Sequence, residues 1–507
     1  MKRRRWTVVL VTLALVLLAC CGGGAALGGW AWSRAKVDTA GEIDFAHKLA
    51  IPPLAESRVD DQGRRVFDLR AQEGRRDFGE GGVTRTWGFN GDYLGPTLRA
   101  KRGEKVLVNV VNGLDEETSV HWHGMHLPAV MDGGPHQSIR PGATWSPTWT
   151  VNQPAASLWY HPHPHGKTAK HVYRGLAGMF IVDDENGGNK ALPNRYGVDD
   201  IPVIVQDRKF DDGGQFAEGD SLGGVGVLGD TVLVNGTVAP YLDVYTERVR
   251  LRLVNGSNAR TYAFGVVDDR EFAMVGTDGG LLPAPIATDR VRLSPGDRAE
   301  IVVAMRPGER VTLRSFPEDQ GTDFFNRRFT GGGDTLDVLE LRAADDLEPS
   351  ADLPATLAPF EPIDPAGAVE TRQFRLAGRN INGQKMDMSR IDAVITKDTT
   401  EIWELTKLDG TPHNFHVHDV QFQVLSVDGQ PPSPEFQGWQ DTVFLEQGST
   451  VRIVARFADY ADPDMPYMFH CHLLTHEDAG MMGQFVVVEP GQEAGRPPTG
   501  SSHNHGQ

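Results

Sequence analysis

The sequence predicts an all-β protein made of three Greek-key β-sandwich domains that follow an N-terminal export segment. Three observations favour this fold class. Similar stretches recur three times along the 507 residues, at a domain-sized interval. Within each repeat, short segments of alternating apolar and polar residues are bounded by Gly, Pro and Asn, which is typical of antiparallel sandwiches. Long helical periodicity is nearly absent after residue 35.

The repeat is marked by an Asn-Gly turn that precedes an alternating apolar stretch. The turns lie about 145 residues apart, at Asn90-Gly91, Asn235-Gly236 and Asn382-Gly383. A second recurring segment follows in each unit, with the sequences RPGATWSPTWTV, SPGDRAEIVVAM and EQGSTVRIVARF. The ends of the two outer units also match, GLAGMFIVDD against GMMGQFVVVE. We therefore expect domains over residues 45–185, 200–345 and 370–490, with a disordered tail over residues 491–507.

The N-terminal 35 residues read as an export segment. Basic residues at positions 2–5 precede an uncharged, largely apolar run over residues 6–32. This run either stays as a membrane anchor or ends in a lipidated Cys20, and a twin-arginine signal is a weaker third reading. All three readings place the body of the protein outside the cytoplasm, on the outer face of the cell membrane or in the envelope, or secreted after cleavage.

Charge and cysteine content exclude several kinds of protein. The formal net charge of −18 argues against a nucleic-acid partner, because phosphates demand surfaces rich in Lys and Arg. Cysteine occurs only at Cys20, Cys21 and Cys471, so an exported body has no disulfide framework. Cys471 is then a buried cysteine without a chemical role, a nucleophile or a metal ligand.

Histidine is concentrated in four His-x-His pairs in the outer two repeats. The pairs are His121/His123, His161/His163, His416/His418 and His470/His472. Where the outer repeats carry HWH and HVH, the middle repeat reads TYAF. Residues i and i+2 of a strand share a face, so each pair offers two imidazoles side by side, a ready chelating element. Eight imidazoles in one site indicate a transition metal such as Cu, Zn, Fe or Ni.

The stretch HCHLLTHEDAGMM adds a different kind of site. Cys471, His476 and Met481 lie at intervals of five, and His413 stands three residues before His416. Two imidazoles, one thiolate and a weak axial thioether are diagnostic of blue copper. Because His470 and His472 flank Cys471, a covalent path would join this one-electron site to a cluster of several coppers.

The motifs HWHG, WYHPHPHG, HNFHVHD and HCHLLTHEDAGMM resemble those of the multicopper oxidases, over nearly all of residues 45–490. The resemblance is closest to three-domain bacterial laccases and cuprous oxidases, and it implies cupredoxin-like domains, four coppers and reduction of O₂ to water. It implies a type 1 copper on His413, Cys471, His476 and axial Met481. It implies a type 2 copper on His121 and His416. It implies a type 3 pair on His123, His161, His163, His418, His470 and His472.

The same resemblance implies carboxylates that supply protons for O₂ reduction. Asp132, eleven residues beyond His121, matches the acid beside the cluster, and Glu477 matches a second relay acid. The plainer alternatives are a turn residue before Gly133 for Asp132 and a solvated loop acid for Glu477. Four other histidines off the ligand pattern are expected to have supporting or surface roles: His126, His136, His165 and His171.

The electron donor is a small molecule or a metal ion. Known cuprous oxidases carry a methionine-rich insert that is absent here, and Thr411 stands where a methionine would be. Thioethers select Cu(I), so this departure favours phenols or diamines, with Asp409 accepting the phenolic proton. The alternatives to an oxidase are an envelope scaffold and a copper-sequestering protein, both without turnover. A copper nitrite reductase is set aside, because it lacks four such pairs.

Overall fold

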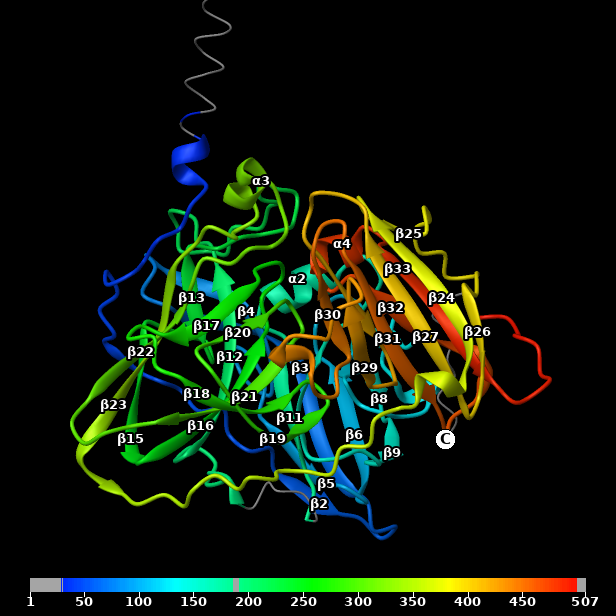
Figure 1. Ribbon diagram of the computed structural model, residues 1–507, viewed down its shortest axis with the longest axis horizontal. Coiled ribbons are helices and arrows are strands. Elements are labelled where there is room, and N and C mark those ends of the chain that lie inside the picture. Colours follow the sequence, from blue (N-terminus) through cyan, green and yellow to red (C-terminus); the bar gives the residue numbers. More distant parts are fainter. Residues whose placement is uncertain (1–28, 30, 186–190, 499–507) are drawn as a thin grey trace, which may run out of the picture.

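The computed structural model describes residues 29, 31–185 and 191–498, and it confirms an all-β chain of three sandwiches (Figure 1). Most of the export segment predicted over residues 1–35 lies outside the described residues. So do Cys20 and residues 499–507 of the predicted tail. Among the residues that are described, no helix is both long and apolar enough to cross a membrane.

The first sandwich occupies the N-terminal part of the chain. Its strands are β2 (Ser57–Val59), β3 (Arg65–Asp77), β4 (Val83–Phe89), β5 (Leu98–Lys101), β6 (Lys105–Asn112), β7 (His121–His123), β8 (Thr144–Trp145), β9 (Thr148–Thr150), β10 (Ala156–His161) and β11 (Gly178–Asp183). One sheet has the order β5-β11-β10-β7, and the other is built around β3 and β6. The alternation in KVLVNVVN explains β6, because Val106, Val108 and Val110 all point into the core.

The middle sandwich is the largest. Its strands are β12 (Asp200–Arg208), β13 (Thr231–Val234), β14 (Thr237–Val238), β15 (Pro240–Thr246), β16 (Arg248–Asn255), β17 (Tyr262–Val266), β18 (Phe272–Thr277), β19 (Gly280–Thr288), β20 (Arg290–Leu293), β21 (Arg298–Ala304), β22 (Arg310–Ser315) and β23 (Leu336–Glu348), joined by β1 (His47–Lys48). They form the sheets β14-β13-β12-β16-β21-β18-β19 and β1-β15-β23-β22-β17-β20.

The third sandwich completes the chain. Its strands are β24 (Ala368–Ala377), β25 (Asn380–Ile381), β26 (Ala393–Thr396), β27 (Thr399–Lys407), β28 (His413–Val417), β29 (Phe422–Val427), β30 (Thr442–Leu445), β31 (Thr450–Phe457), β32 (Asp462–His470) and β33 (Met482–Val488). They form the sheets β25-β24-β27-β31-β29 and β26-β33-β32-β28-β30. Short helices lie between the strands of the three sandwiches: η1 (Ala129–Met131), α2 (Thr168–Tyr173), α3 (Phe324–Phe329), η3 (Pro365–Gly367), η4 (Pro434–Phe436) and α4 (Leu474–Asp478).

One sheet of each sandwich repeats the same topology, which explains the threefold sequence repeat. The orders β5-β11-β10-β7, β15-β23-β22-β17 and β26-β33-β32-β28 are equivalent, and each begins with a parallel pair. The matching ends GLAGMFIVDD and GMMGQFVVVE become β11 and β33. The middle repeat's TYAF falls on β17, at the place of the histidine-bearing β7 and β28.

Each sandwich has its own hydrophobic core, and further contacts hold the sandwiches together. A separate apolar cluster that includes Tyr93, Trp159 and Leu233 fills the interface between the first and middle sandwiches. The Tyr467 hydroxyl of the third sandwich donates to the Leu127 carbonyl of the first over 2.7 Å. These packed interfaces fix the relative positions of side chains that come from different sandwiches.

Candidate metal centre

The paired histidines lie where equivalent strands of the first and third sandwiches end. In the first, β7 carries His121 and His123, and the neighbouring β10 ends with His161 directly opposite His121. In the third, His416 of β28 lies opposite His470, the last residue of β32. The repeated topology thus presents imidazoles from both sandwiches at one interface.

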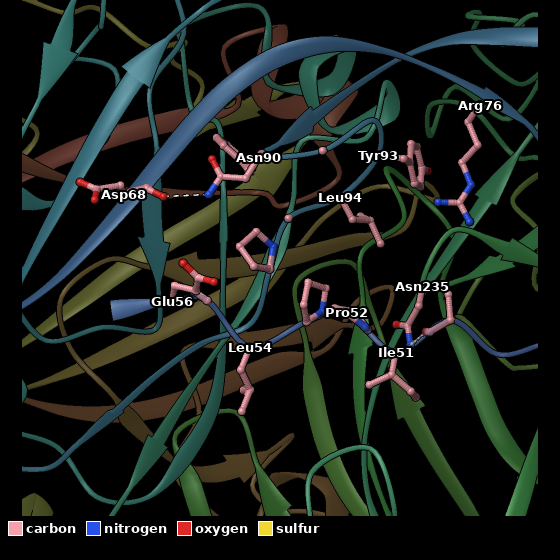
Figure 2. A pocket seen from close by; sticks show the side chains of 17 residues that line it. Ile51, Pro52, Leu54, Glu56, Asp68, Arg76, Asn90, Tyr93, Leu94 and Asn235 are labelled. Atoms are coloured by element: carbon pink, nitrogen blue, oxygen red, sulfur yellow. Dashed lines mark hydrogen bonds between the residues drawn. The ribbon is translucent and has the colours of Figure 1, made fainter. Parts of the chain in front are cut away.

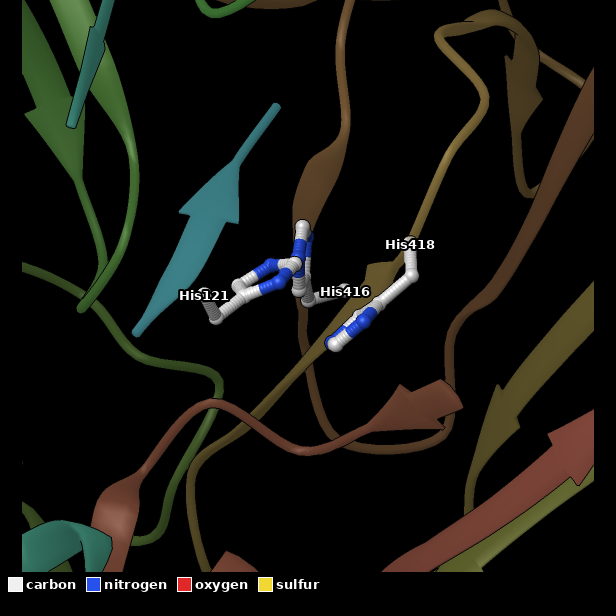
Figure 3. Close-up of side chains that lie close together, drawn as sticks. All are labelled: His121, His416 and His418. Carbon is white, nitrogen blue, oxygen red and sulfur yellow. The ribbon is translucent and has the colours of Figure 1, made fainter. Parts of the chain in front are cut away.

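The eight paired histidines gather into three fully buried groups. In each group the nitrogens available to a metal lie within 4.8 Å of one another. The members of the three groups are His123, His161 and His472; His163, His418 and His470; and His121, His416 and His418 (Figure 3). Residues from the first and third sandwiches contribute to every group, so none is complete within one sandwich.

The two members of a pair mostly belong to different groups, which differs from the expectation of a chelating pair. His123 and His161 share a group, whereas His121 and His163 lie in the other two. Only the strand β7 contains a whole pair, and the other three pairs extend beyond a strand end. Where β10 and β32 end, the imidazoles of His161/His163 and of His470/His472 fall in separate groups and can serve several metal ions.

The chemistry of the donor atoms fits bound metal. His121 Nε2 and His416 Nε2 are buried and have no hydrogen-bond partner within the described structure. Their Nδ1 atoms are fixed by backbone carbonyls, since His121 Nδ1 lies 3.0 Å from the Asp132 carbonyl oxygen and His416 Nδ1 lies 2.8 Å from that of Asp441. A buried polar atom without a partner costs free energy that a metal ion would remove.

The protonation of the cluster also favours metal binding. Burial lowers the pKa of His123, His161, His163, His416, His470 and His472 well below the ordinary histidine value. Burial likewise lowers the pKa of His418, to about 4. Neutral imidazoles keep the lone pairs that coordinate transition metals.

The predicted thiolate site forms a fourth group. Cys471 Sγ lies 3.6 Å from His413 Nδ1 and 3.7 Å from His476 Nδ1, and all three side chains are buried. Met481 is buried in the same core cluster, and its carbonyl accepts a hydrogen bond from the Cys471 backbone N–H. Burial raises the pKa of Cys471 to about 12, so this thiol would become a thiolate only when a metal ion binds to it.

Cys471 is covalently joined to two of the imidazole groups. His470 belongs to the group of His163 and His418, and His472 belongs to the group of His123 and His161. Those two groups are themselves close, because the rings of His470 and His472 lie 5.5 Å apart between their centroids. The backbone on either side of one sulfur therefore reaches both groups.

Asp132 lies against the cluster. Its Oδ2 atom is 2.7 Å from His418 Nδ1, and the side chain is buried. Burial raises the pKa of Asp132, but the adjacent imidazoles of His418 and His121 outweigh this effect and hold the pKa well below its usual range. Asp132 also ends the turn of η1. The next residue must be glycine, because a Cβ at Gly133 would lie 1.7 Å from the Val120 carbonyl oxygen. The turn and the contact with the cluster therefore coexist.

Glu477 is buried rather than solvated. It is the fourth residue of α4, and its two carboxylate oxygens lie 3.4 Å from His163 Nδ1 and 3.3 Å from His470 Nδ1. Burial raises the pKa of Glu477 well above the ordinary glutamate value. A carboxyl group that keeps its proton beside the cluster can deliver that proton there.

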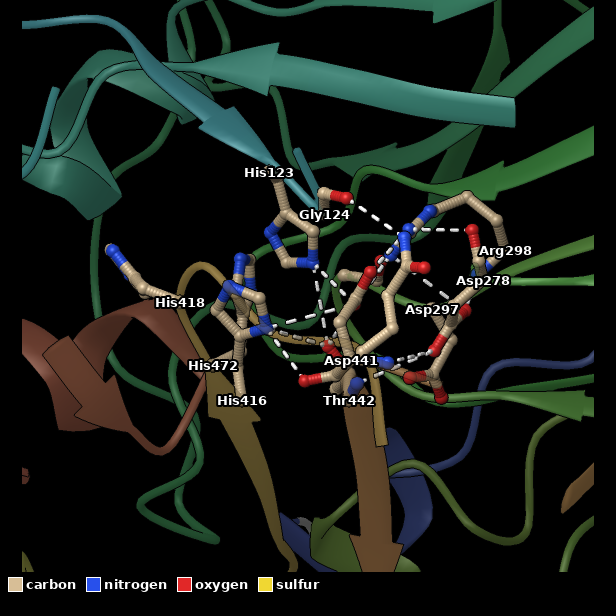
Figure 4. A network of polar contacts seen from close by, with 12 residues as sticks. His123, Gly124, Asp278, Asp297, Arg298, His416, His418, Asp441, Thr442 and His472 are labelled. Carbon is tan, nitrogen blue, oxygen red and sulfur yellow. Dashed lines mark hydrogen bonds and ion pairs between the residues drawn. The ribbon is translucent and has the colours of Figure 1, made fainter. Parts of the chain in front are cut away.

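A charged network that was not anticipated from the sequence supports the cluster from the middle sandwich (Figure 4). The Asp441 carboxylate lies 3.0 Å from His123 Nε2, and Arg298 of β21 donates to both of its oxygens. Gly124 leaves room for this pair, because a Cβ there would lie 2.5 Å from Asp441 Oδ2. Arg298 lies in the recurring segment SPGDRAEIVVAM, and this recurrence is the only feature of the sequence that singles out the residue.

The outer edges of the thiolate group contact the middle and third sandwiches. Asp409 Oδ1 lies 3.1 Å from His413 Nε2, and the Asp409 side chain is partly exposed. His476 Nε2 lies 2.9 Å from the carbonyl oxygen of Gly224, in a loop of the middle sandwich. Asp409 is therefore placed between solvent and the buried His413.

Four further histidines of the described structure, those expected to have supporting or surface roles, take no part in the groups. His126 lies 2.8 Å from Asp419 and 3.0 Å from Asp459, and His136 lies 2.9 Å from Gln484. His171 bridges Thr118 and Glu116, and His165 is exposed.

A separate pocket lies away from these groups. Its volume is about 540 Å³, and Arg76, Tyr93 and the Asn-Gly turn residues Asn90 and Asn235 line it (Figure 2). None of the residues predicted from the sequence as functional lines this pocket.

Comparisons with known proteins agree with this geometry. Models of multicopper oxidase domains match residues 71–187 and 360–491. The multicopper oxidase mco of Staphylococcus haemolyticus is 36% identical over 452 residues, which cover 87% of this chain and 93% of that protein. The cell division protein FtsP of Xenorhabdus nematophila is 38% identical over 449 residues, with 88% and 93% covered.

A solved structure gives the same result. The laccase-like multicopper oxidase CueO of Ochrobactrum sp. superposes with a TM-score of 0.79 at 37% identity, over 87% of this chain and all of that chain. Proteins of this family pass electrons from a donor to O₂ and bind copper. The chain belongs to the multicopper oxidase family, and it is of the bacterial three-domain type.

Proposed function

We propose that the protein is an exported oxidase that takes single electrons from a reducing substrate and uses four of them to reduce O₂ to two waters. The donor site is formed by His413, Cys471, His476 and Met481, which would hold one ion. The O₂ site is formed by the three imidazole groups at the interface of the sandwiches over residues 45–185 and 370–490. Bound copper would supply the one-electron chemistry at both sites, with four ions per chain.

The observation that carries this proposal is the position of Cys471 between His470 and His472. The sulfur belongs to the group that the partly exposed Asp409 borders, and each neighbouring imidazole belongs to a different histidine group. A one-electron site and a cluster that needs four electrons are thereby joined by a few covalent bonds. In the ligand assignment that we propose, His121 and His416 hold the type 2 ion and the remaining six histidines hold the type 3 pair.

The chain itself would manage protons and water. Asp132 is ionised and holds the Nδ1 side of His418, which orients that imidazole towards the cluster. Glu477 keeps its proton and stands beside His163 and His470, where protons for water formation are consumed. The complete burial of the groups keeps bulk solvent away from reactive oxygen species.

The donors that fit best are phenols and diamines. Asp409, half-buried beside His413, can accept the proton that a phenol releases on oxidation. The Ochrobactrum relative is described as having oxidase activity towards lignin model compounds and lignosulfonate. Cu(I) is the second donor class, and it is disfavoured because the thioether-rich insert is missing. The ratio of kcat/KM for a methoxyphenol to that for Cu(I) on one purified sample separates the two classes.

The copper-loaded full chain tests the oxidase itself. We expect about four coppers per chain, an intense blue absorption band, and one O₂ consumed for every four electrons taken from ferrocyanide or a methoxyphenol. Copper-loaded protein that lacks the blue band would contradict the proposal. So would a consumption of two electrons per O₂, which yields peroxide.

A second candidate is a role in the cell envelope without turnover, which the identity to the cell division protein FtsP favours. The two candidates differ in one measurement, the uptake of O₂ by the copper-loaded chain. Steady uptake with a soluble donor supports the oxidase, and copper binding without uptake supports a scaffold or a copper-sequestering protein.

A further inference from the structure

The two most exposed large hydrophobic side chains of the described structure are Leu222 and Phe324, whose exposed fractions are 78% and 72%. Leu408 is also largely exposed, at 57%. All three belong to segments that adjoin the thiolate group, whereas the exposed Val59 and Val369 belong to other strands. Exposed apolar side chains gathered at one place usually mark a binding surface.

Neighbouring residues in the chain place these side chains near the thiolate group. Leu222 precedes Gly224 by two residues, and the Gly224 carbonyl oxygen contacts His476 Nε2. Leu408 is adjacent to Asp409, which contacts His413. Phe324 begins α3, and Nδ2 of Asn326 in the same helix would lie 3.3 Å from a Cβ on Gly410, the residue after Asp409.

The described chain begins on the same surface. Trp32, in a helical turn over residues 31–34, packs on Phe324 and Phe329 at ring-centroid distances of 5.4 and 6.0 Å. Arg328 donates to the Trp32 carbonyl oxygen and stacks on its ring. In Figure 1 this turn, α3 and α4 all lie at the upper end of the molecule. The uncharged residues 6–28 come directly before it in the sequence.

We propose that the surface formed by Trp32, Leu222, Phe324 and Leu408, here called the donor face, rests on a lipid membrane. On this reading the donors are hydroquinones dissolved in that membrane. A retained apolar run over residues 6–28 would enter the lipid beside Phe324, and Trp32 would sit at the interface, where tryptophan is favoured. This inference rests on the oxidase proposed above.

The reaction balances without another reactant. Each hydroquinone loses two electrons and two protons and becomes a quinone, so two hydroquinones reduce one O₂ to two waters. The lipid is favoured over a protein partner because the chain itself leads from the donor face into an apolar, uncharged run. Next to the donor face, Arg379 and Asp220 form an ion pair at 2.9 Å, which suits the polar headgroup layer of a membrane.

Lipid contact is tested without any turnover. The full chain, with Cys20→Ser and Cys21→Ser, carries an environment-sensitive fluorophore at Leu222→Cys or, as a control, at Val59→Cys. Val59 has an exposed fraction of 65%, and its strand β2 lies at the opposite end in Figure 1. In vesicles of phosphatidylcholine and phosphatidylglycerol, the Leu222→Cys label should shift to the blue and the Val59→Cys label should not. Equal emission from both labels would overturn the inference.

The donor class is tested with charge on the donor face. The double variant L222E/F324E is compared with V59E/V369E, which places the same charge on other exposed apolar residues. The rate with a vesicle-dissolved hydroquinone, divided by the rate with ferrocyanide, should fall at least about fivefold in L222E/F324E alone. An unchanged ratio would overturn the inference and leave the oxidase intact. A wild-type chain that oxidises neither donor would instead contradict the proposed function.

Discussion

Arg298 and Asp441 form a forked ion pair, with hydrogen bonds of 2.7 and 2.5 Å between two fully buried side chains. The same Asp441 carboxylate lies 3.0 Å from His123 Nε2. Arg298 comes from the middle sandwich, Asp441 from the third and His123 from the first. The sandwich that supplies no predicted metal ligand therefore helps to fix the position of a ligand that does belong to the cluster.

Replacing Arg298 should destabilise the protein and disturb the cluster together. The variant Arg298→Met leaves the Asp441 carboxylate buried without its guanidinium partner, which should cost about 3–5 kcal/mol of unfolding free energy. Denaturant unfolding measures this cost, and the electron paramagnetic resonance spectrum of the copper-loaded protein reports the cluster. Arg58→Met removes an exposed ion pair with Asp68 and serves as the control. Equal stability and equal spectra in both variants would contradict a positioning role for Arg298.

Replacing Asp132 should reduce turnover more than it reduces copper binding. Asp132→Asn keeps the size of the side chain but removes the charge beside His418 Nδ1. We expect kcat to fall about 10- to 100-fold, while most of the copper is retained. Asp115→Asn, on an exposed loop of the same sandwich, is the matched control. If Asp132→Asn turns over like this control, Asp132 is only a turn residue.

Replacing Glu477 should slow the proton-consuming part of the reaction. Glu477→Gln keeps the buried shape between His163 and His470 but carries no transferable carboxyl proton. We expect kcat to fall roughly 10- to 100-fold, with a larger solvent deuterium isotope effect than in the wild type. An unchanged kcat and isotope effect would show that protons reach the cluster by another route.

Lys407 gives a prediction about pH and stability. Its side chain is buried, its Nζ has no hydrogen-bond partner within the described structure, and burial lowers its pKa to about 8. The folded state releases this proton at lower pH than the unfolded chain, so stability increases as the pH rises from about 8 towards 10.5. Lys407→Met should lose this slope and be more stable at pH 7, by about 1–3 kcal/mol.

Denaturant unfolding of the metal-free protein at several pH values measures the effect. The exposed Lys105→Met is the control, and its stability should follow the wild type at every pH. A Lys407→Met variant that is less stable than the wild type at pH 7 would mean that the Lys407 ammonium has a stabilising partner.

The fold was predictable because alternation and repetition act locally. The segment KVLVNVVN specifies one buried face by itself, and the Asn-Gly turns recur with Asn90, Asn235 and Asn382 in the left-handed backbone conformation that Asn tolerates. The exact domain boundaries stay predictions. The histidines of the outer repeats predicted a shared site between the first and third domains, whereas the packing that brings equivalent sheets together there could not be read from local patterns.

The site was predictable in composition and less so in arrangement. The His-x-His spacing and the order of Cys471, His476 and Met481 marked the ligand candidates. The exact grouping of the imidazoles was not predicted for His161/His163 and His470/His472, because β10 and β32 end within these pairs and the backbone leaves the strand geometry. Asp441 and Arg298 were missed because their roles arise from a contact between residues 143 positions apart.

The most direct test of the account is O₂ uptake by the copper-loaded Cys471→Ser variant with ferrocyanide as donor. The account predicts that the blue band and steady turnover are both lost, because the thiolate that joins the two sites is gone. About three coppers per chain should remain, bound by the histidine groups, which the substitution does not touch. Turnover at the wild-type rate in this variant would contradict the proposed electron path through Cys471.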